Sequence, residues 1–214
     1  MRSSKVRVVV GFVCGAGALA LCLVAGFRVV SAAEVTLTTR EVSLGKVHPG
    51  VLPSSLAVSP DGKSLAYAAR SGDKQLVVMD GVEGKEYDGI LASSPVFSPD
   101  SKRVAYAAIR AQKVLVVVDG VEGKECDGIG EATLVFSPDS KRVAYAAKRG
   151  DKWLVIVHGV EGKEYDGFLK GSRLVFDSAS QLHALAFRGD EFLRVEVKIV
   201  MPGTEPSGAP RPPL

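Results

Sequence analysis

The chain has 214 residues, of which 46% are hydrophobic and 24% are charged, and its formal net charge is +3 at pH 7. The basic excess lies in residues 1–33, which hold four basic side chains and no acid, so the remainder has 23 basic against 24 acidic side chains. This nearly neutral body gives no electrostatic reason to expect a nucleic acid as partner.

Residues 1–33 have the layout of an export signal. A short basic stretch precedes the apolar run Val8–Phe27, and Ser31–Ala33 offers the small residues of a cleavage site. The run is also long enough to span a bilayer. We therefore expect a signal peptide or an N-terminal membrane anchor, with the body periplasmic or secreted and touching the membrane only through this segment. Because Cys126 is the only cysteine beyond it, the body has no intramolecular disulfide.

A repeat of 39 residues organises the domain expected over residues 34–200. The sequence SPDSKRVAYAA occurs at Ser98–Ala108 and again at Ser137–Ala147, and the close copy SPDGKSLAYAA begins at Ser59. A second motif, GVEGKEYDG, keeps the same spacing at Gly81–Gly89, at Gly120–Gly128 with one change, and at Gly159–Gly167. Such a period predicts stacked copies of one supersecondary unit.

Each unit contains four short β-type runs separated by turn residues. In the second unit these runs are Pro95–Phe97, Arg103–Ala108, Lys113–Asp119 and Gly123–Ile129. Pro99 and the Asp119-Gly120 pair mark turns between them. Four antiparallel strands in about 40 residues predict an all-β fold, a β-propeller of about four blades.

The phase of the repeat suggests how a ring could close. The chain starts with a fourth strand around Gly45–Val51 and stops after a third strand at Glu191–Val197. The chain ends are expected to pair in one blade, which removes two exposed sheet edges. Three arrangements of the blades are compatible with this phase: a closed monomer, an open arc, and a larger ring completed by two chains. Residues 201–214 contain five prolines and are expected to be a disordered tail.

The SPDGKSLAYAA and SPDSKRVAYAA segments resemble the WD40-like propeller repeat of TolB-type proteins. The resemblance covers roughly Lys46–Val197. It implies a β-propeller that takes part in protein interactions at the cell envelope. The chain departs from this family in having about four units, where such propellers usually have six or more, and in its GVEGKEYDG segment.

The repeated acidic residues are the strongest candidates for chemistry. A ring of them could bind a cation at a propeller axis, but all occupy turns or strand ends, where Asp stabilises the backbone, and a catalytic residue would not recur in every unit. We interpret them as structural and expect no metal or cofactor. They are Asp61, Asp100, Asp139, Asp88, Asp127 and Asp166. The two RGD triplets, at Arg149–Asp151 and Arg188–Asp190, are explained as hairpin turns.

The connections that vary between units are those from strand two to three and from strand four to the next strand one. We expect them on one face, and loops on a rigid scaffold are the usual site of recognition. Equivalent arginines in three units would make this face partly basic, suited to an acidic peptide. The predicted binding residues are Arg70, Asp73, Arg110, Gln112, Glu131, Arg149, Asp151, Lys170, Arg173, Arg188 and Asp190.

These observations predict an exported, non-catalytic propeller that binds a protein or peptide through its variable face. One alternative is a propeller enzyme of hydrolase or lyase type with an axial site that the sequence does not reveal. Another is a propeller fragment that is active only as an oligomer.

Overall fold

The computed structural model describes residues 37–200, so the expectations for residues 1–33 and 201–214 lie outside the described part. The chain divides into two compact units, Met1–Ser43 and Leu44–Leu214, and all the strands of residues 37–200 belong to the second. The single helix among the described residues is the 3-10 turn Pro53–Ser55. No helix in this part of the chain is long and apolar enough to cross a membrane.

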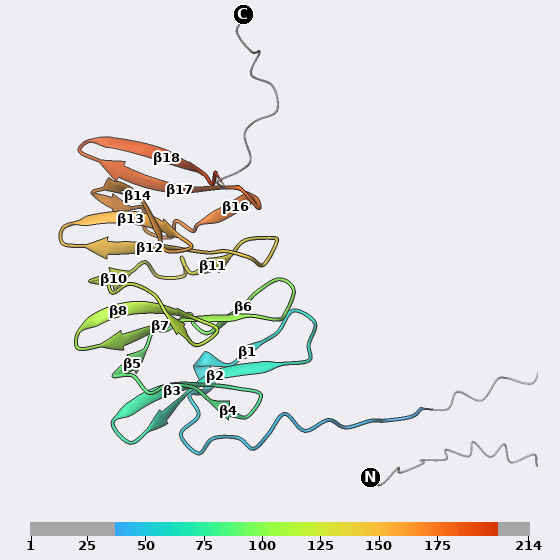
Figure 1. Cartoon of the computed structure of the whole chain (residues 1–214). Coiled ribbons are helices and arrows are strands. Elements are labelled where there is room, and N and C mark those ends of the chain that lie inside the picture. The colour runs from blue at the N-terminus through green and yellow to red at the C-terminus, as the bar shows by residue number, and fades with distance from the viewer. Residues whose placement is uncertain (1–36, 201–214) are drawn as a thin grey trace, which may run out of the picture. The chain divides into compact units, whose positions relative to one another are not determined.

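Four antiparallel sheets follow one another along the chain (Figure 1). The first contains β1 (Ala57–Val58), β2 (Leu65–Ser71), β3 (Lys74–Met79) and β4 (Val82–Glu83). The second contains β5 (Gly89–Ile90), β6 (Val96–Phe97), β7 (Val104–Arg110), β8 (Lys113–Val118) and β9 (Val121–Glu122). The third contains β10 (Gly128–Ile129), β11 (Val135–Phe136), β12 (Val143–Arg149), β13 (Lys152–Val157) and β14 (Val160–Tyr165). The fourth contains β15 (Gly167–Phe168), β16 (Val175–Ser178), β17 (Gln181–Arg188) and β18 (Glu191–Lys198). The predicted all-β class is confirmed.

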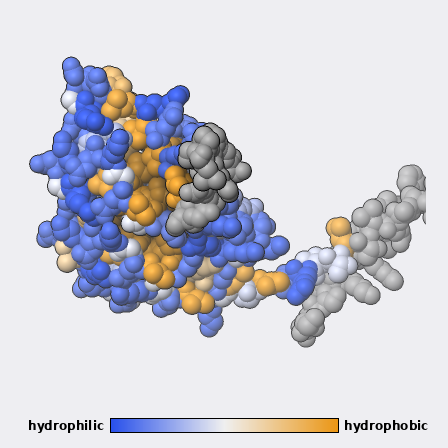
Figure 2. All heavy atoms as spheres, turned by 45° about the horizontal axis from the view of Figure 1, so that its top comes forward, coloured by the Kyte–Doolittle hydropathy of each residue, from blue (hydrophilic) through white to orange (hydrophobic). Residues whose placement is uncertain are grey.

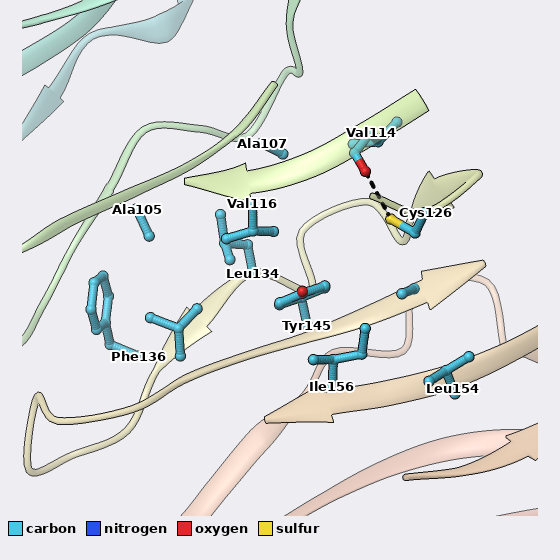
Figure 3. Packing of buried hydrophobic residues seen from close by; sticks show 12 residues of the cluster. Ala105, Ala107, Val114, Val116, Cys126, Leu134, Phe136, Tyr145, Leu154 and Ile156 are labelled. Atoms are coloured by element: carbon cyan, nitrogen blue, oxygen red, sulfur yellow. Dashed lines mark hydrogen bonds between the residues drawn. The ribbon is translucent and has the colours of Figure 1, made fainter. Parts of the chain in front are cut away.

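Hydrophobic side chains on both faces of the inner sheets form the core. On β7, Ala105 and Ala107 face the third sheet, whereas Tyr106 and Ala108 face the first. The third run of each unit is therefore apolar almost throughout, as expected of strands covered on both sides. Figure 3 shows the cluster between the second and third sheets, where Cys126 donates a hydrogen bond to the Val114 carbonyl at 3.2 Å. Each sheet is thus held mainly by its neighbours in the stack.

The predicted fourth strand, Gly123–Ile129 in the second unit, is divided between two sheets. Its beginning stays with its own sheet, where Cys126 bridges Val114, but Gly128 and Ile129 pair with β12 of the next sheet. A glycine stands at each such crossing; at Gly128 a Cβ atom would make an ordinary contact of 3.7 Å with Lys148, whereas at Gly167 the next sheet comes too close for one. A Cβ atom on Gly167 would lie 2.5 Å from the ring of Phe187. The chain therefore passes from one sheet to the next inside the run that we expected to be one strand.

The leading segment, defined as residues 44–51, also differs from expectation. Val51 bridges Ala69 of β2, and the Arg70 amide donates to the Gly50 carbonyl at 2.8 Å. The segment thus takes the place beside β2 that β5 takes beside β7, instead of completing the last sheet. In Figure 1 the first and last sheets lie at opposite ends of the stack. The predicted closure by the chain ends is not confirmed.

The connections from strand four to strand one run along the edge of the second strand. In the third sheet the Ala146 amide donates to Thr133 Oγ1 at 3.2 Å, and Thr133 Oγ1 donates to the Gly130 carbonyl at 2.8 Å. Ser55, Ser94 and Ser172 make the equivalent bond to the second strand in the other sheets. In each sheet a Ser or Thr hydroxyl therefore accepts a hydrogen bond from a backbone amide of the second strand. This amide would otherwise lack a partner, because the strand beside it is interrupted at this point.

Candidate functional site

The connections between the second and third strands are tight hairpins, and we call this side of the sheets the hairpin end. Ala111 and Gln112 both have positive φ, 47° and 66°, which is the type I′ turn. Gly150 and Gly189, the central residues of the RGD triplets, have φ of 57° and 58°. Glycine at the first central position alone gives the type II′ turn. The triplets therefore lie in hairpin turns, as predicted.

Each hairpin from the second sheet onward is tied to the sheet before it by a repeated aspartate. The Gly150 amide donates to Asp127 Oδ2 at 2.6 Å, and Lys113 Nζ donates to the other carboxylate oxygen of Asp127. The hydrogen bond from Lys113 lowers the pKa of Asp127 and raises the pKa of the lysine. Asp88 and Asp166 make the same contacts in their units. These acids hold one sheet to the next.

The other repeated acids stabilise the turns between the first and second strands. Asp100 Oδ1 accepts a hydrogen bond from Ser98 Oγ at 2.6 Å and one from the Lys102 amide at 3.2 Å. The Asp100 amide in turn donates to Ser140 Oγ of the next sheet at 3.0 Å. The serine bond is the main cause of the lowered pKa of Asp100. The structural interpretation of this motif is supported by these contacts.

The three equivalent arginines at the hairpin end differ in their partners. Arg110 pairs with Glu122 at 2.7 Å and with Glu125 at 2.9 Å. Arg149 pairs with Glu161 at 2.7 Å. The Arg188 guanidinium lies 5.2 Å from the centre of the Tyr165 ring. Because two of the three arginines already face carboxylates, the predicted basic rim offers less positive charge than its sequence indicates.

The predicted binding residues fall into two groups. The exposed residues Arg70, Asp73, Gln112, Asp151 and Asp190 lie at the hairpin end with the three arginines. Glu131, Lys170 and Arg173 lie in the connections between strands four and one, beside the middle of β12 and β17. Both kinds of connection were expected on one face. That expectation is wrong, because the second kind is hydrogen-bonded to the strand edge.

Glu122 links the first two sheets. It accepts hydrogen bonds from Lys85 Nζ at 2.5 Å and from the Tyr87 hydroxyl at 3.1 Å, both in the first sheet, and pairs with Arg110 of its own sheet. The hydrogen bonds from Lys85 and Arg110 lower the pKa of Glu122 to about 2. Glu161 repeats the arrangement with Lys124 and Arg149, and its pKa is lowered too.

A pocket of about 350 Å³ lies between the second and third sheets, at the end of the strands opposite the hairpins. We call it the turn-end pocket. Its wall is apolar apart from the hydroxyl of Tyr145, and its rim carries charged and polar side chains. The wall residues are Val116, Val118, Val121, Val143 and Tyr145, and the rim residues are Arg103, Asp119, Glu122 and His158.

The rim of this pocket is held by contacts between its own charged groups. Arg103 Nε donates to Asp119 Oδ2 at 2.7 Å, and Arg103 Nη1 donates to the Ser140 carbonyl of the next sheet at 3.1 Å. His158 is exposed, with a φ of 50°, in the position that Asp80 and Asp119 hold in the earlier units. The pocket therefore has a fixed polar rim around an apolar interior.

Sequence reasoning missed the turn-end pocket because its residues lie within the constant parts of the repeat. The only related difference between units is that Val118 and Val157 stand where the first unit has Met79, whose longer side chain packs into the cluster between the first and second sheets. No group of three or more His, Cys, Asp or Glu side chains that could hold a metal ion is found in residues 37–200.

No protein-family model and no curated protein matches the chain. Among solved structures, TolB from Acinetobacter baumannii is similar at 17% identity and a TM-score of 0.42, over 70% of this chain and 41% of that one. Prolyl oligopeptidase B from Galerina marginata is similar at 15% identity and a TM-score of 0.43, over 77% and 29% of the two chains. Acylaminoacyl peptidase from Pyrococcus horikoshii is similar at 15% identity and a TM-score of 0.38, over 70% and 32%. The chain thus spans less than half the length of each of these proteins.

Proposed function

We propose that the chain is an exported, non-catalytic interaction module of β-propeller type, in which the four sheets are blades and the partner is a protein or peptide. The observation that supports this proposal is the turn-end pocket. It has the volume and the apolar lining typical of recognition sites, with a few polar groups fixed at its mouth. The repeated acids, by contrast, are engaged in turns and between sheets.

The lining of the pocket favours an apolar side chain of the partner. Arg103 is already bound to Asp119, and Glu122 to Lys85 and Arg110, so these groups gain little from a new ionic partner. An aliphatic or aromatic side chain would bury apolar surface against the valines. Complete burial of such a side chain contributes about 1.5–3 kcal/mol, or about 10- to 100-fold in affinity. We therefore expect an extended peptide segment with one anchoring apolar residue.

Selection from a displayed random-peptide library against the full-length chain tests this function. The critical variant is Val118→Met, which narrows the pocket with the longer side chain that the first unit has at the same position, Met79. We expect selected peptides to share an apolar position and to lose about 10- to 100-fold in affinity to Val118→Met. The matched control is Val160→Met, at an exposed valine outside the pocket lining. Failure to select any peptide would contradict the proposed function.

The hairpin end is the second candidate surface, and the same experiment examines it. Arg188 forms no salt bridge with a carboxylate of residues 37–200, although its charge contributes to the lowered pKa of Asp166, and Asp190 is exposed nearby. If Arg188→Ala and Asp190→Ala weaken binding while Val118→Met does not, the partner binds at the hairpin end, as the sequence suggested.

A further inference from the structure

The last sheet ends in a free strand edge. The third strands β3, β8 and β13 each pair with a fourth strand on their outer side. β18 has the equivalent place in the fourth sheet, but among the described residues it pairs only with β17. Figure 1 shows β18 at one end of the stack. Its outer edge therefore presents backbone amides and carbonyls that no strand of residues 37–200 satisfies.

β18 has few of the features that protect a strand edge. Protected edges are typically short, carry a proline, or are bent by a β-bulge. β18 is eight residues long, contains no proline, and pairs with β17 without a shift in register. Its sequence, EFLRVEVK, has charged side chains of both signs. Such an edge repels many strands but can accept a strand whose charges follow the complementary order.

The hydrogen bonds to β17 show which backbone groups of β18 point outward. The Ile199 amide, directly after the end of β18, donates to the Ser180 carbonyl at 2.8 Å. Bonds to one neighbour recur at every second residue of an antiparallel strand. The backbone groups of the odd-numbered residues 191–197 therefore face β17, whereas those of the even-numbered residues 192–198 face the free edge.

We propose that β18 pairs with β18 of a second copy of this protein, in antiparallel orientation, around a two-fold axis at Val195. The outward-facing residues then meet one another. Arg194 lies opposite Glu196 of the second copy, and Phe192 lies opposite Lys198. Because the axis repeats each contact, the free backbone groups of both edges are satisfied together.

The charges of the strand select this register. Arg194 Nη2 and Glu196 Oε1 lie 2.6 Å apart within one chain, and both side chains are exposed. Around Val195 each of them also faces the opposite charge of the second copy, so that two arginines and two glutamates form one cluster. A shift of the two-fold axis by one residue places either two arginines or two glutamates directly opposite each other. Like charges in such positions destabilise a sheet.

The side chains on the two faces of the sheet also suit this arrangement. On the inner face, Leu193 and Val197 are half-buried and pack against the cluster that contains Tyr165. Across the axis Leu193 lies opposite Val197 of the second copy, so this apolar face continues from one sheet into the other. On the outer face, Phe192 is 79% exposed. The alkyl part of Lys198 from the second copy would cover its ring.

The surface at this end of the stack has a mixed character. Figure 2 shows hydrophobic surface beside hydrophilic surface where this end is turned toward the viewer. Leu185 and Phe192 are exposed apolar residues of the last sheet, and Arg194 and Glu196 are exposed charged ones. Mixed surfaces are typical of complexes whose members are also stable alone. We therefore expect a dimer whose formation depends on protein concentration.

Copurification of two full-length copies with different C-terminal tags tests the proposal. The copies are coexpressed, one tag is captured, and the amount of the other tag is measured. We expect wild-type copies to copurify. Arg194→Glu in both copies places an acid opposite Glu196, and Glu196→Arg in both copies places a base opposite Arg194. Either change should lower the recovery about 10-fold or more, because two attractive cross-strand pairs become repulsive.

The decisive pair combines the two changes in different copies. When one copy carries Arg194→Glu and the other carries Glu196→Arg, every charge again faces its opposite. The recovery should then return to the wild-type level, which also shows that both variants are folded. The matched control is Arg70→Glu, at an exposed arginine at the hairpin end of the first sheet, and it should leave the recovery unchanged.

Three results would overturn the proposal. Wild-type copies might fail to copurify. Recovery that neither single change lowers would show that the copies associate through another surface. A mixed pair that is not restored would show that the register is wrong. The turn-end pocket lies between the second and third sheets, so Val118→Met should leave the copurification unchanged. The proposed function and the pairing of β18 can therefore fail separately.

Discussion

The change Tyr87→Cys gives the first unit the residue that the second unit has at Cys126. Tyr87 is 2% exposed, its ring centre lies 6.1 Å from that of Tyr106, and its hydroxyl donates to Glu122. The cluster between the first and second sheets holds this ring beside that of Tyr106, whereas the equivalent cluster has Cys126 in this position beside Tyr145. The substitution should therefore open a cavity between the first two sheets.

The expected loss of stability follows from the buried area. An aromatic side chain buries about 150–250 Å². Replacing it with Cys removes roughly 100–150 Å² of that contact, which at about 25 cal/mol per Å² costs about 2.5–4 kcal/mol. The total free energy of unfolding of a domain is about 5–15 kcal/mol. Tyr87→Cys should therefore remove a large part of the stability of the first two sheets.

Urea unfolding of the full-length chain measures this loss with two signals. Far-UV circular dichroism follows all the sheets, and the fluorescence of Trp153, the only tryptophan, follows the third sheet. Tyr87→Phe is the control, because it removes the hydroxyl bond to Glu122 but keeps the ring. A loss below about 1 kcal/mol for Tyr87→Cys would refute the assignment of this ring to the core, since truncation of a buried aromatic costs about 3–5 kcal/mol.

Three further predictions concern charge, turn geometry and the buried thiol. Because the pKa of Glu122 is lowered, its contribution to stability is present above pH 4.5, its ordinary pKa, and is lost as the pH falls toward about 2. The stability difference between wild type and Glu122→Gln, measured by urea unfolding, should therefore shrink over this pH range. A constant difference would contradict the ion-pair assignment. Ala111→Asn with Gln112→Gly should raise the unfolding free energy by about 1–2 kcal/mol, because both positions have positive φ, whereas Asp151→Gly, at a position without positive φ, should not. Cys126 is 4% exposed and burial raises its pKa, so in a Cys14→Ser, Cys22→Ser background a thiol reagent should react only after urea unfolds the chain; rapid reaction in the native state would place Cys126 at the surface.

Local features of the fold could be predicted from the sequence because neighbouring residues determine them. The SPDSK turn works through bonds between Ser98, Asp100 and Lys102, all within five residues of one another. The strands themselves follow from apolar runs between such turns. The passage of the chain from one sheet to the next at Asp127-Gly128 could not be predicted in this way. The run Gly123–Ile129 is continuous in the sequence, and nothing in it indicates that its first half pairs with β8 and its second half with β12. The one signal of this passage was the glycine that recurs at each crossing, at positions 50, 89, 128 and 167.

The candidate sites were harder to predict for a related reason. The charges of Arg110 and Arg149 are visible in the sequence, but their partners Glu122 and Glu161 lie in another strand, so the predicted rim is more basic than the folded one. The turn-end pocket is lined by residues from the constant parts of the repeat, and the change from Met79 to Val118 at its wall leaves the hydrophobic pattern intact. Only the packing of two sheets shows that a pocket lies there.

Differences between units are therefore more informative about function than the repeated residues. A residue that meets the same neighbours in every sheet is fixed by the geometry of the stack. Asp80 and Asp119 illustrate this, since each accepts a hydrogen bond from the backbone amide that begins the second strand, at 2.8 and 3.0 Å. His158 replaces that aspartate in the third unit and stands exposed at the rim of the turn-end pocket. The third unit thus gives up a stabilising turn contact at the rim of this pocket, and this departure from the repeat agrees with the binding role that we propose for the pocket.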